Sequence, residues 1–198
     1  LGKGRNGNTW FMSPSKGLAM SIILKESISI HDGLLIPIAA GVAIAKALEN
    51  RGGNPKLKWP NDILINNKKC GGVLCETRIK NSCIVQMVIG IGLNVNETKN
   101  DFPDKLSNSA TSLAIETNQS NQRELLCAII TTYFERLLND LPSSLPIWQH
   151  YCNHINKSVS FNQGGINQNG IFKGLDNDGR AIIQMDAKEI LFNSIILE

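Results

Sequence analysis

The chain has 198 residues, of which 42% are hydrophobic and 19% are charged, and its formal net charge is +3. This composition supplies a packed core and excludes a disordered chain. The small charge, without any basic run longer than Lys68-Lys69, gives no indication of nucleic-acid binding. No uninterrupted apolar run approaches 18 residues, so we expect no membrane span. The five cysteines are irregularly spaced and odd in number, which indicates reduced thiols and a cytoplasmic protein.

Apolar periodicity and turn residues predict a mixture of strands and helices up to residue 156. In chain order these are a strand at 17–25, a helix at 33–53 ending at a double glycine, a strand-turn-strand at 56–65, strands at 70–79 and 83–95, and helices at 121–140 and 144–156. Asn121 is the expected N-cap of the helix at 121–140. Residues 97–120 are polar and loop-like, with weak helical character near 112–116. Because short turns join consecutive strands, we expect antiparallel pairing.

From Lys157 onward, short alternating strands are separated by glycine and Asn/Asp turns, a pattern typical of a small β-barrel. The expected fold class is therefore α+β, with a mainly antiparallel sheet that carries helices on one face, followed by a small C-terminal SH3-like β-barrel. The expected domains are 1–156 and 157–198.

The stretch GKGRNGN at residues 2–8 has glycines at alternate positions. Such glycines let the backbone approach a ligand and present its N–H groups to an anion, and Lys3 and Arg5 add positive charge. The stretch is not a Walker A loop, and G-x-G alone is a weak signal. A solvated, flexible terminus explains this stretch equally well when it is considered alone.

The stretch KWPND at residues 58–62 places an Asn-Asp pair at the end of a predicted strand. Asn61 and Asp62 could face a polyphosphate with its Mg²⁺, because that ion prefers oxygen ligands and needs few of them from the protein. The alternative is an ordinary Asn-Asp turn with Trp59 in the core, which the stretch alone favours.

Two further stretches place glycines inside predicted strands. In KKCGGVL (68–74), Gly71 and Gly72 weaken a strand unless something must approach its backbone. In GIGLNVN (90–96), the strand ends in asparagines that could bind phosphate or a metal. The structural alternatives are a solvated lysine turn in the first stretch and a bulge at a strand end in the second.

In this order and spacing, the four stretches resemble the motifs of biotin protein ligases (biotin–[acetyl-CoA-carboxylase] ligases). That family has Gly-Arg-Gly-Arg-x-Gly-x-x-Trp, Lys-Trp-Pro-Asn-Asp, Lys-x-x-Gly-Ile-Leu-x-Glu and Gly-x-Gly-x-Asn. The corresponding sequences here are GKGRNGNTW (2–10), KWPND (58–62), KCGGVLCE (69–76) and GIGLN (90–94). TSL at 111–113 also falls where the family has it. The resemblance extends over essentially the whole chain, including the C-terminal module.

The resemblance implies that ATP activates biotin to biotinyl-5′-AMP, and that biotin then passes to a lysine of a biotin carboxyl carrier protein. The first step brings two anions together, so it requires cationic side chains and Mg²⁺. The resemblance also allows a homodimer. Two alternatives remain: a lipoate or octanoate ligase or transferase of the same superfamily, and a non-catalytic remnant that binds a ligand or a carrier protein. The GKGR loop, KWPND and the C-terminal module favour biotin over lipoate.

The resemblance also assigns site residues. Lys69 is the expected catalytic contact to the biotin carboxylate and the α-phosphate, and Arg5 lies on the loop that closes over the adenylate. The residues expected to bind biotin or the adenylate are Lys3, Gly4, Arg5, Trp10, Lys69, Gly72, Val73, Gly90 and Gly92. Those expected to face ATP and Mg²⁺ are Asn61, Asp62 and Asn94, without a metal site built from protein ligands alone. Cys70 and Cys75 are expected to be core thiols.

The chain departs from the family pattern in its first residues. Lys3 and Asn8 stand where the family commonly has arginine, and lysine at residue 3 keeps the charge but loses the planar fork. Family members have a Ser-Thr-Asn segment and a glutamine upstream of this loop, where they bind the biotin ring system, whereas this sequence starts at Leu1. We therefore expect a catalytic domain that is incomplete at its amino end, with weak biotin binding and doubtful activity.

Overall fold

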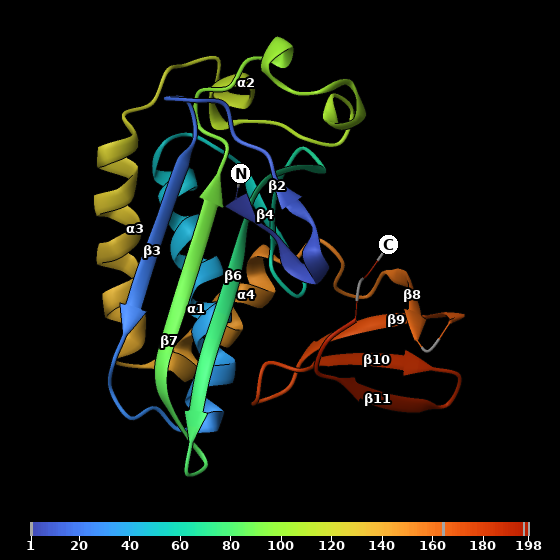
Figure 1. The fold of residues 1–198 in the computed structure, drawn as a ribbon. Coiled ribbons are helices and arrows are strands. Elements are labelled where there is room, and N and C mark those ends of the chain that lie inside the picture. Colours follow the sequence, from blue (N-terminus) through green and yellow to red (C-terminus); the bar gives the residue numbers. More distant parts are fainter. Residues whose placement is uncertain (1, 164, 196, 198) are drawn as a thin grey trace.

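The computed structural model describes residues 2–163, 165–195 and 197. Its main element is a five-stranded sheet with the order β3-β7-β6-β5-β4, in which all neighbours are antiparallel (Figure 1). The strands are β3 (Leu18–Leu24), β4 (Pro55–Lys58), β5 (Asp62–Ile65), β6 (Lys68–Lys80) and β7 (Cys83–Leu93). The predicted strands and their antiparallel pairing are thus confirmed, with shifts of a few residues at the ends.

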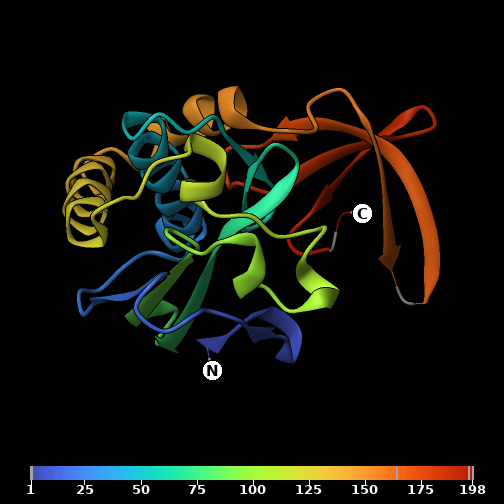
Figure 2. The same ribbon diagram turned by 90° about the horizontal axis from the view of Figure 1, so that it is seen from above.

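Three helices cover one face of this sheet, and a short hairpin lies on the other face (Figure 2). The helices are α1 (Ile30–Asn50), α3 (Arg123–Leu138) and α4 (Ser144–Tyr151), and a short α2 (Leu113–Thr117) follows β7. The hairpin is formed by β1 (Gly2–Lys3) and β2 (Thr9–Trp10), which pair with each other. The predicted α+β class with helices on one face is confirmed.

Helix α1 is the central core helix, and most of its side chains are fully buried between the sheet and the other helices. Within the described residues it is the one helix that is long and apolar enough to cross a membrane by length and composition, and 67% of its apolar window is buried. A core helix passes the same test, so this composition is weak evidence for a membrane span.

The helix ends differ from the predictions for local reasons. α1 was predicted to begin at Gly33, but it begins three residues earlier, at Ile30. The Ser29 hydroxyl accepts a hydrogen bond from the Asp32 N–H and acts as the N-cap. Asn121 was expected to cap α3, but this prediction is wrong: the N-cap is Gln122. The Asn121 side chain instead accepts a hydrogen bond from Arg51 Nε.

The C-terminal part forms a second antiparallel sheet with the order β11-β10-β9-β8. Its strands are β8 (Ser158–Gln163), β9 (Ile166–Leu175), β10 (Ala181–Met185) and β11 (Lys188–Phe192). Among the described residues β8 does not pair with β11, and Phe161 of β8 forms an isolated antiparallel bridge with Leu197. The predicted β-rich C-terminal unit is therefore confirmed, and among the described residues no closed barrel is found.

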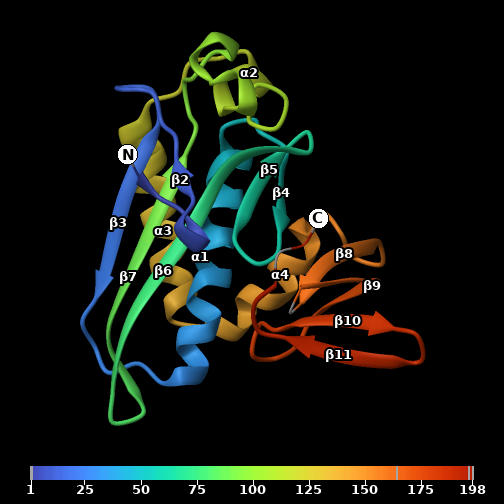
Figure 3. The same ribbon diagram turned by 45° about the vertical axis from the view of Figure 1, so that its right-hand side comes forward.

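The two sheets share one continuous hydrophobic core. Phe172 of β9 packs against Trp148 of α4, with ring centroids 6.4 Å apart. Trp59, which precedes β5, donates a hydrogen bond from its ring nitrogen to the Gly179 carbonyl at 3.2 Å. The C-terminal sheet is thereby fixed beside α4 and beside the turn between β4 and β5 (Figure 3). The proposed division into domains at residues 156 and 157 stays a prediction.

Candidate functional site

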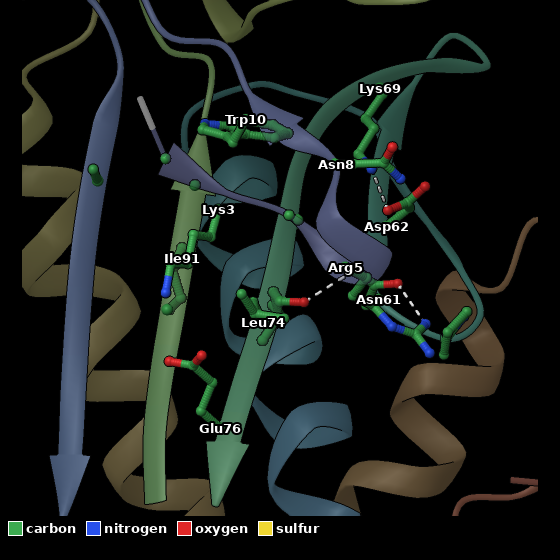
Figure 4. A pocket seen from close by; sticks show the side chains of 18 of the residues that line it. Lys3, Arg5, Asn8, Trp10, Asn61, Asp62, Lys69, Leu74, Glu76 and Ile91 are labelled. Atoms are coloured by element: carbon green, nitrogen blue, oxygen red, sulfur yellow. Dashed lines mark hydrogen bonds and ion pairs between the residues drawn. The ribbon is translucent and has the colours of Figure 1, made fainter. Parts of the chain in front are cut away.

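A cavity of about 500 Å³ opens between the β1–β2 hairpin and the face of the sheet that the helices leave free. Figure 4 shows that its side chains come from the hairpin, from the turn before β5, and from β6 and β7. The predicted site residues that line the cavity are Lys3, Gly4, Arg5, Trp10, Asn61, Asp62, Lys69, Gly72, Val73, Gly90 and Gly92. The fold therefore brings together residues that lie up to 89 positions apart in the sequence (3 to 92).

A row of small residues across the strands forms the floor of this cavity. Gly72 of β6 pairs with Gly92 of β7, which in turn pairs with Ala19 of β3. A Cβ atom on Gly72 would meet no surrounding atom closer than 3.6 Å, and one on Gly90 would meet only a carbonyl oxygen, at 3.4 Å. A larger side chain at either glycine would therefore project into the cavity, so the glycines keep the floor hollow.

Gly92 has a different role, because the ring of Trp10 packs directly on it. A Cβ atom on Gly92 would lie 2.7 Å from the Cε2 and Nε1 atoms of that ring, which is too close for any side chain. The contact seats the last residue of the hairpin on the sheet and makes the indole a wall of the cavity. The buried Nε1 donor of Trp10 has no hydrogen-bond partner among the described residues.

Lys69 is turned toward the cavity by a bulge in β6. Leu64 pairs with Lys69, whereas the preceding residue Ile63 pairs with Gly71, so Cys70 is the extra residue of the bulged strand. Without the bulge, Lys69 and Gly72 would lie on opposite faces of the strand, because they are three residues apart. The bulge brings both to the cavity side.

The Lys69 ammonium contacts an acidic side chain and an aromatic ring. Its Nζ lies 2.5 Å from Asp62 Oδ1 and 5.8 Å from the centroid of the Trp10 ring. The Lys69 side chain is 39% exposed and that of Asp62 is 26% exposed. An ion pair this exposed contributes roughly 1 kcal/mol or less. An anionic ligand that enters the cavity can therefore compete with Asp62 for the ammonium.

The backbone of Lys69 is fixed by the loop before α2. Its N–H donates to the Ser109 carbonyl at 2.8 Å, and its carbonyl accepts from the Thr111 N–H at 2.9 Å. This loop adds a short parallel bridge to β6 where the strand begins. The bulge and the bridge together fix the position of the Lys69 backbone, and therefore the point from which its side chain extends into the cavity.

Arg5 and Asn61 connect the hairpin to the sheet. Arg5 Nη1 donates to Asn61 Oδ1 at 3.0 Å, and Asn61 Nδ2 donates to the Val73 carbonyl at 3.0 Å. The Val73 N–H donates in turn to the Asn61 carbonyl at 3.0 Å. Val73 itself has its side chain in the hydrophobic core, so it lines the cavity mainly through its backbone.

Asn94 does not line the cavity, unlike the other predicted site residues. It is 3% exposed, its Nδ2 donates to the Thr111 carbonyl at 2.9 Å, and its N–H donates to the Cys70 carbonyl at 2.7 Å. This position gives no support to the expectation that Asn94 faces ATP. Its bonds instead stabilise the loop that holds the Lys69 backbone.

Several residues that line the cavity were not predicted from the sequence. They include Ala19 and Ser21 of β3, Leu74 and Glu76 of β6, Val88 of β7, and Leu197 near the carboxyl end. The alternation of side chains along a strand could have identified those on β6 and β7, because they share a face with the motif glycines. No local signal could have identified Leu197, which the fold brings in from the other sheet.

The two cysteines near the cavity are protonated thiols. Cys70 is fully buried and donates to the Asn94 carbonyl at 3.3 Å, and burial raises the pKa of its thiol. Burial also raises the pKa of Cys75 to about 12. A thiol with a raised pKa is a poor nucleophile at neutral pH. Both cysteines are therefore structural, in agreement with the sequence analysis.

Among the described residues, no three His, Cys, Asp or Glu side chains form a group that could hold a metal ion. Near the cationic residues of the cavity, the Asp62 carboxylate and the Asn61 amide are oxygen donors on adjacent residues. Such a pair suits Mg²⁺ that arrives with a polyphosphate and keeps most of its ligands from water and phosphate.

Comparison with known proteins gives concordant matches in sequence. Residues 1–94 match the Biotin/lipoate A/B protein ligase family. The chain is 32% identical over 197 residues to the Bifunctional ligase/repressor BirA of Bacillus subtilis (strain 168), which covers 95% of this chain and 59% of that protein. It is 24% identical over 192 residues to the Biotin--[acetyl-CoA-carboxylase] ligase of Paracoccus denitrificans, with 92% and 80% covered. The chain thus spans less than two thirds of the Bacillus relative.

Among solved structures, the fold is similar to that of the biotin protein ligase from Aquifex aeolicus in complex with biotin and ATP. The TM-score is 0.80 at 26% identity, over 99% of this chain and 84% of that one. The match covers both sheets and includes the motifs that line the cavity. Residues 1–94 therefore carry a domain of the Biotin/lipoate A/B protein ligase family, and the chain is similar over most of its length to proteins named as biotin ligases.

Proposed function

We propose that this protein activates biotin with ATP to form biotinyl-5′-AMP and pyrophosphate, and then transfers the biotinyl group to a lysine of a biotin carboxyl carrier protein. The observation that carries the proposal is the placement of Lys69 at a glycine-floored cavity under a cationic hairpin. The names of the relatives, and the biotin and ATP in the similar Aquifex structure, support the same reaction.

In the first step, a carboxylate oxygen of biotin attacks the α-phosphorus of ATP, and the bond from that phosphorus to pyrophosphate breaks. Both reactants are anions, so cations placed in advance lower the barrier. Lys69 can leave its exposed pair with Asp62 and contact both the carboxylate and the α-phosphate. Mg²⁺ bound to the triphosphate would neutralise further charge, and Asp62 and Asn61 are the residues that would hold it.

The hollow floor and the hairpin give this step its geometry. Gly72 and Gly90 leave room for an apolar chain to lie on the sheet, and the Trp10 ring can pack against its side. Lys3, Gly4 and Arg5 lie on the hairpin that covers the cavity. Such a cover keeps water from the reactive mixed anhydride until the acceptor arrives.

In the second step, the ε-amine of the carrier lysine attacks the carbonyl carbon of the anhydride, and AMP leaves with the bonding electrons. We assign both steps to residues 1–156 and a supporting role to residues 157–198, whose Leu197 lines the cavity. All five cysteines are free thiols in the structure, which supports a reducing compartment such as the cytoplasm.

The experiment is to incubate the protein with Mg²⁺, ATP and biotin, and to detect biotinyl-5′-AMP by mass spectrometry. A carrier domain is then added, and its mass increase and its streptavidin signal are measured. We expect both products with biotin. A matched series with lipoate replaces biotin, and a lipoyl adenylate formed in preference to the biotinyl adenylate would contradict the proposal. Binding of biotin and ATP without either product would indicate a non-catalytic protein.

A further inference from the structure

The guanidinium of Arg5 joins three parts of the molecule that are far apart in the sequence. One nitrogen, Nη1, donates to Asn61 Oδ1 at 3.0 Å, and the other, Nη2, donates to Ser194 Oγ at 2.6 Å. Asn61 is bonded to β6 at Val73. A continuous chain of hydrogen bonds therefore runs from the C-terminal segment, through the hairpin, to the floor of the cavity.

Ser194 is exposed, but the segment that carries it is held in place. Ile195 directly follows it and is 9% exposed within the shared core, and Leu197 is 3% exposed. Leu197 also forms an antiparallel bridge to Phe161 of β8. The hydroxyl of Ser194 is thus presented to Arg5 from the bend that follows β11, next to two anchored residues.

The hairpin, by contrast, has few contacts of its own. β1 and β2 share two residue pairs, Gly2 with Trp10 and Lys3 with Thr9, and they form a sheet separate from the two larger ones. Between them, the Gly4 N–H donates to the Asn8 carbonyl and the Asn8 N–H donates to the Arg5 carbonyl. The cover of the cavity is therefore held mainly by side chains, namely Trp10 on Gly92 and the two bonds of Arg5.

We infer that Ser194 is a positioning residue that holds the β1–β2 hairpin closed over the cavity through Arg5. The catalytic effect of this contact rests on the proposed function, because a closed hairpin would retain the adenylate and exclude water from it. Ser194 contributes no atom to the reaction. Ser194 holds the Arg5 guanidinium in place through a hydrogen bond, so the C-terminal segment helps to keep the adenylate in the closed cavity.

The first test measures the release of preformed biotinyl-5′-AMP from Ser194→Ala, Ser194→Thr and the wild-type protein. Loss of one solvent-exposed hydrogen bond predicts a release that is roughly three- to tenfold faster in Ser194→Ala. Ser194→Thr keeps the hydroxyl and should release at a rate near that of the wild type. Ser158→Ala is the matched control, because Ser158 is also an exposed serine of the C-terminal part, in β8, and is absent from the cavity lining.

A double-mutant cycle separates action through Arg5 from general destabilisation. In an Arg5→Ala background, Ser194→Ala should add no further increase in the release rate. If Ser194→Ala increases the release rate in the Arg5→Ala protein by as much as it does in the wild-type protein, the inference is overturned. An effect of Ser158→Ala as large as that of Ser194→Ala, or no rescue by threonine, would overturn it as well.

The second test does not depend on the chemistry. Amide hydrogen exchange of the ligand-free protein reports how firmly Arg5 holds the hairpin in its folded form, through the N–H groups of Gly4 and Asn8, which are bonded within the hairpin. We expect faster exchange at these two amides in Ser194→Ala and unchanged exchange in α1. Unchanged exchange at the hairpin would contradict the inference even if the enzyme is active. If the wild type forms no adenylate, the proposed function fails, whereas this measurement still decides the role of Ser194.

Discussion

Strand β7 presents two different faces, and a comparison of them separates what stabilises the protein from what forms its site. On the helix side, Met87, Ile89 and Leu93 are buried and belong to the core around α1. On the hairpin side, Gly90 and Gly92 line the cavity. Successive side chains of a strand point to opposite faces, so neighbouring residues in the sequence serve separate purposes. Substitutions on the helix side should therefore change stability, and those on the hairpin side should change binding.

The largest expected effect is that of Lys69→Ala on the cavity side. Loss of a charge positioned for the transition state should reduce the rate of adenylate formation roughly 100- to 1000-fold, by analogy with the loss of one oxyanion-stabilising donor. The rate is measured by pyrophosphate exchange. Lys68→Ala is the control, because Lys68 does not line the cavity. Equal, small effects of the two substitutions would show that Lys69 is only a solvated lysine of a turn.

The counterpart on the helix side is Ile89→Ala. Ile89 is completely buried, so its truncation should lower the free energy of unfolding by about 2–5 kcal/mol through lost burial and a new cavity. Urea unfolding measures this change. The KM for biotin of the protein that remains folded should stay close to the wild-type value. A large rise in KM with unchanged stability would contradict the division between the two faces.

The core also predicts how stability depends on pH. His154 is buried between Trp148 and Phe172, and burial lowers its pKa to about 4. In the unfolded chain the imidazole has its ordinary, higher pKa. As the pH falls below that value, the unfolded state gains a proton that the folded state does not take up, so the stability decreases.

The decrease between about pH 7 and about pH 5 should be about 2 kcal/mol in urea unfolding. His154→Gln removes this group and should flatten that part of the pH profile, whereas His150→Gln, at an exposed position, should leave the profile as in the wild type. An unchanged slope in His154→Gln would rule out His154 as its cause.

The smallest expected effect is that of Gly90→Val on the cavity floor. A Cβ atom at this position meets only the Leu74 carbonyl oxygen, at an ordinary contact distance of 3.4 Å, so the side chain fits the folded protein and should change the melting temperature little. It would occupy the space proposed for the ligand and raise the KM for biotin roughly tenfold, a cost of about 1.4 kcal/mol. Isothermal titration with biotin provides the matching affinity. Unaltered affinity would show that the ligand does not lie on this part of the floor.

Local patterns predicted much of the fold and most of the site. Alternating apolar residues located the strands, helical spacing located α1, and glycines inside strands pointed to the cavity floor. The start of α1 was predicted too late, because it depends on a side-chain bond of Ser29. That Asn94 faces the ligand stays a prediction; in the structure its amide donates to the carbonyl of the buried Thr111.

Other features depend on the tertiary fold and left no signal in the sequence. The bulge at Cys70 that turns Lys69 toward the cavity follows from the pairing of β5 with β6. Ser194 and Leu197 reach the site only because the second sheet packs beside the first. Leu197 also forms an isolated bridge to Phe161 of β8, a contact between residues 36 positions apart that no local pattern predicts.

A crystal structure of the protein with biotin and ATP would show whether the glycine-floored face binds the reactants. We expect ligand density on Gly72 and Gly90, beside Trp10, with an anionic oxygen within hydrogen-bond distance of Lys69 Nζ. The pair between Lys69 and Asp62, at 2.5 Å without ligand, should then be broken or shared with the ligand. Ligand density elsewhere, or a bound ligand that makes no contact with Lys69, would contradict the account.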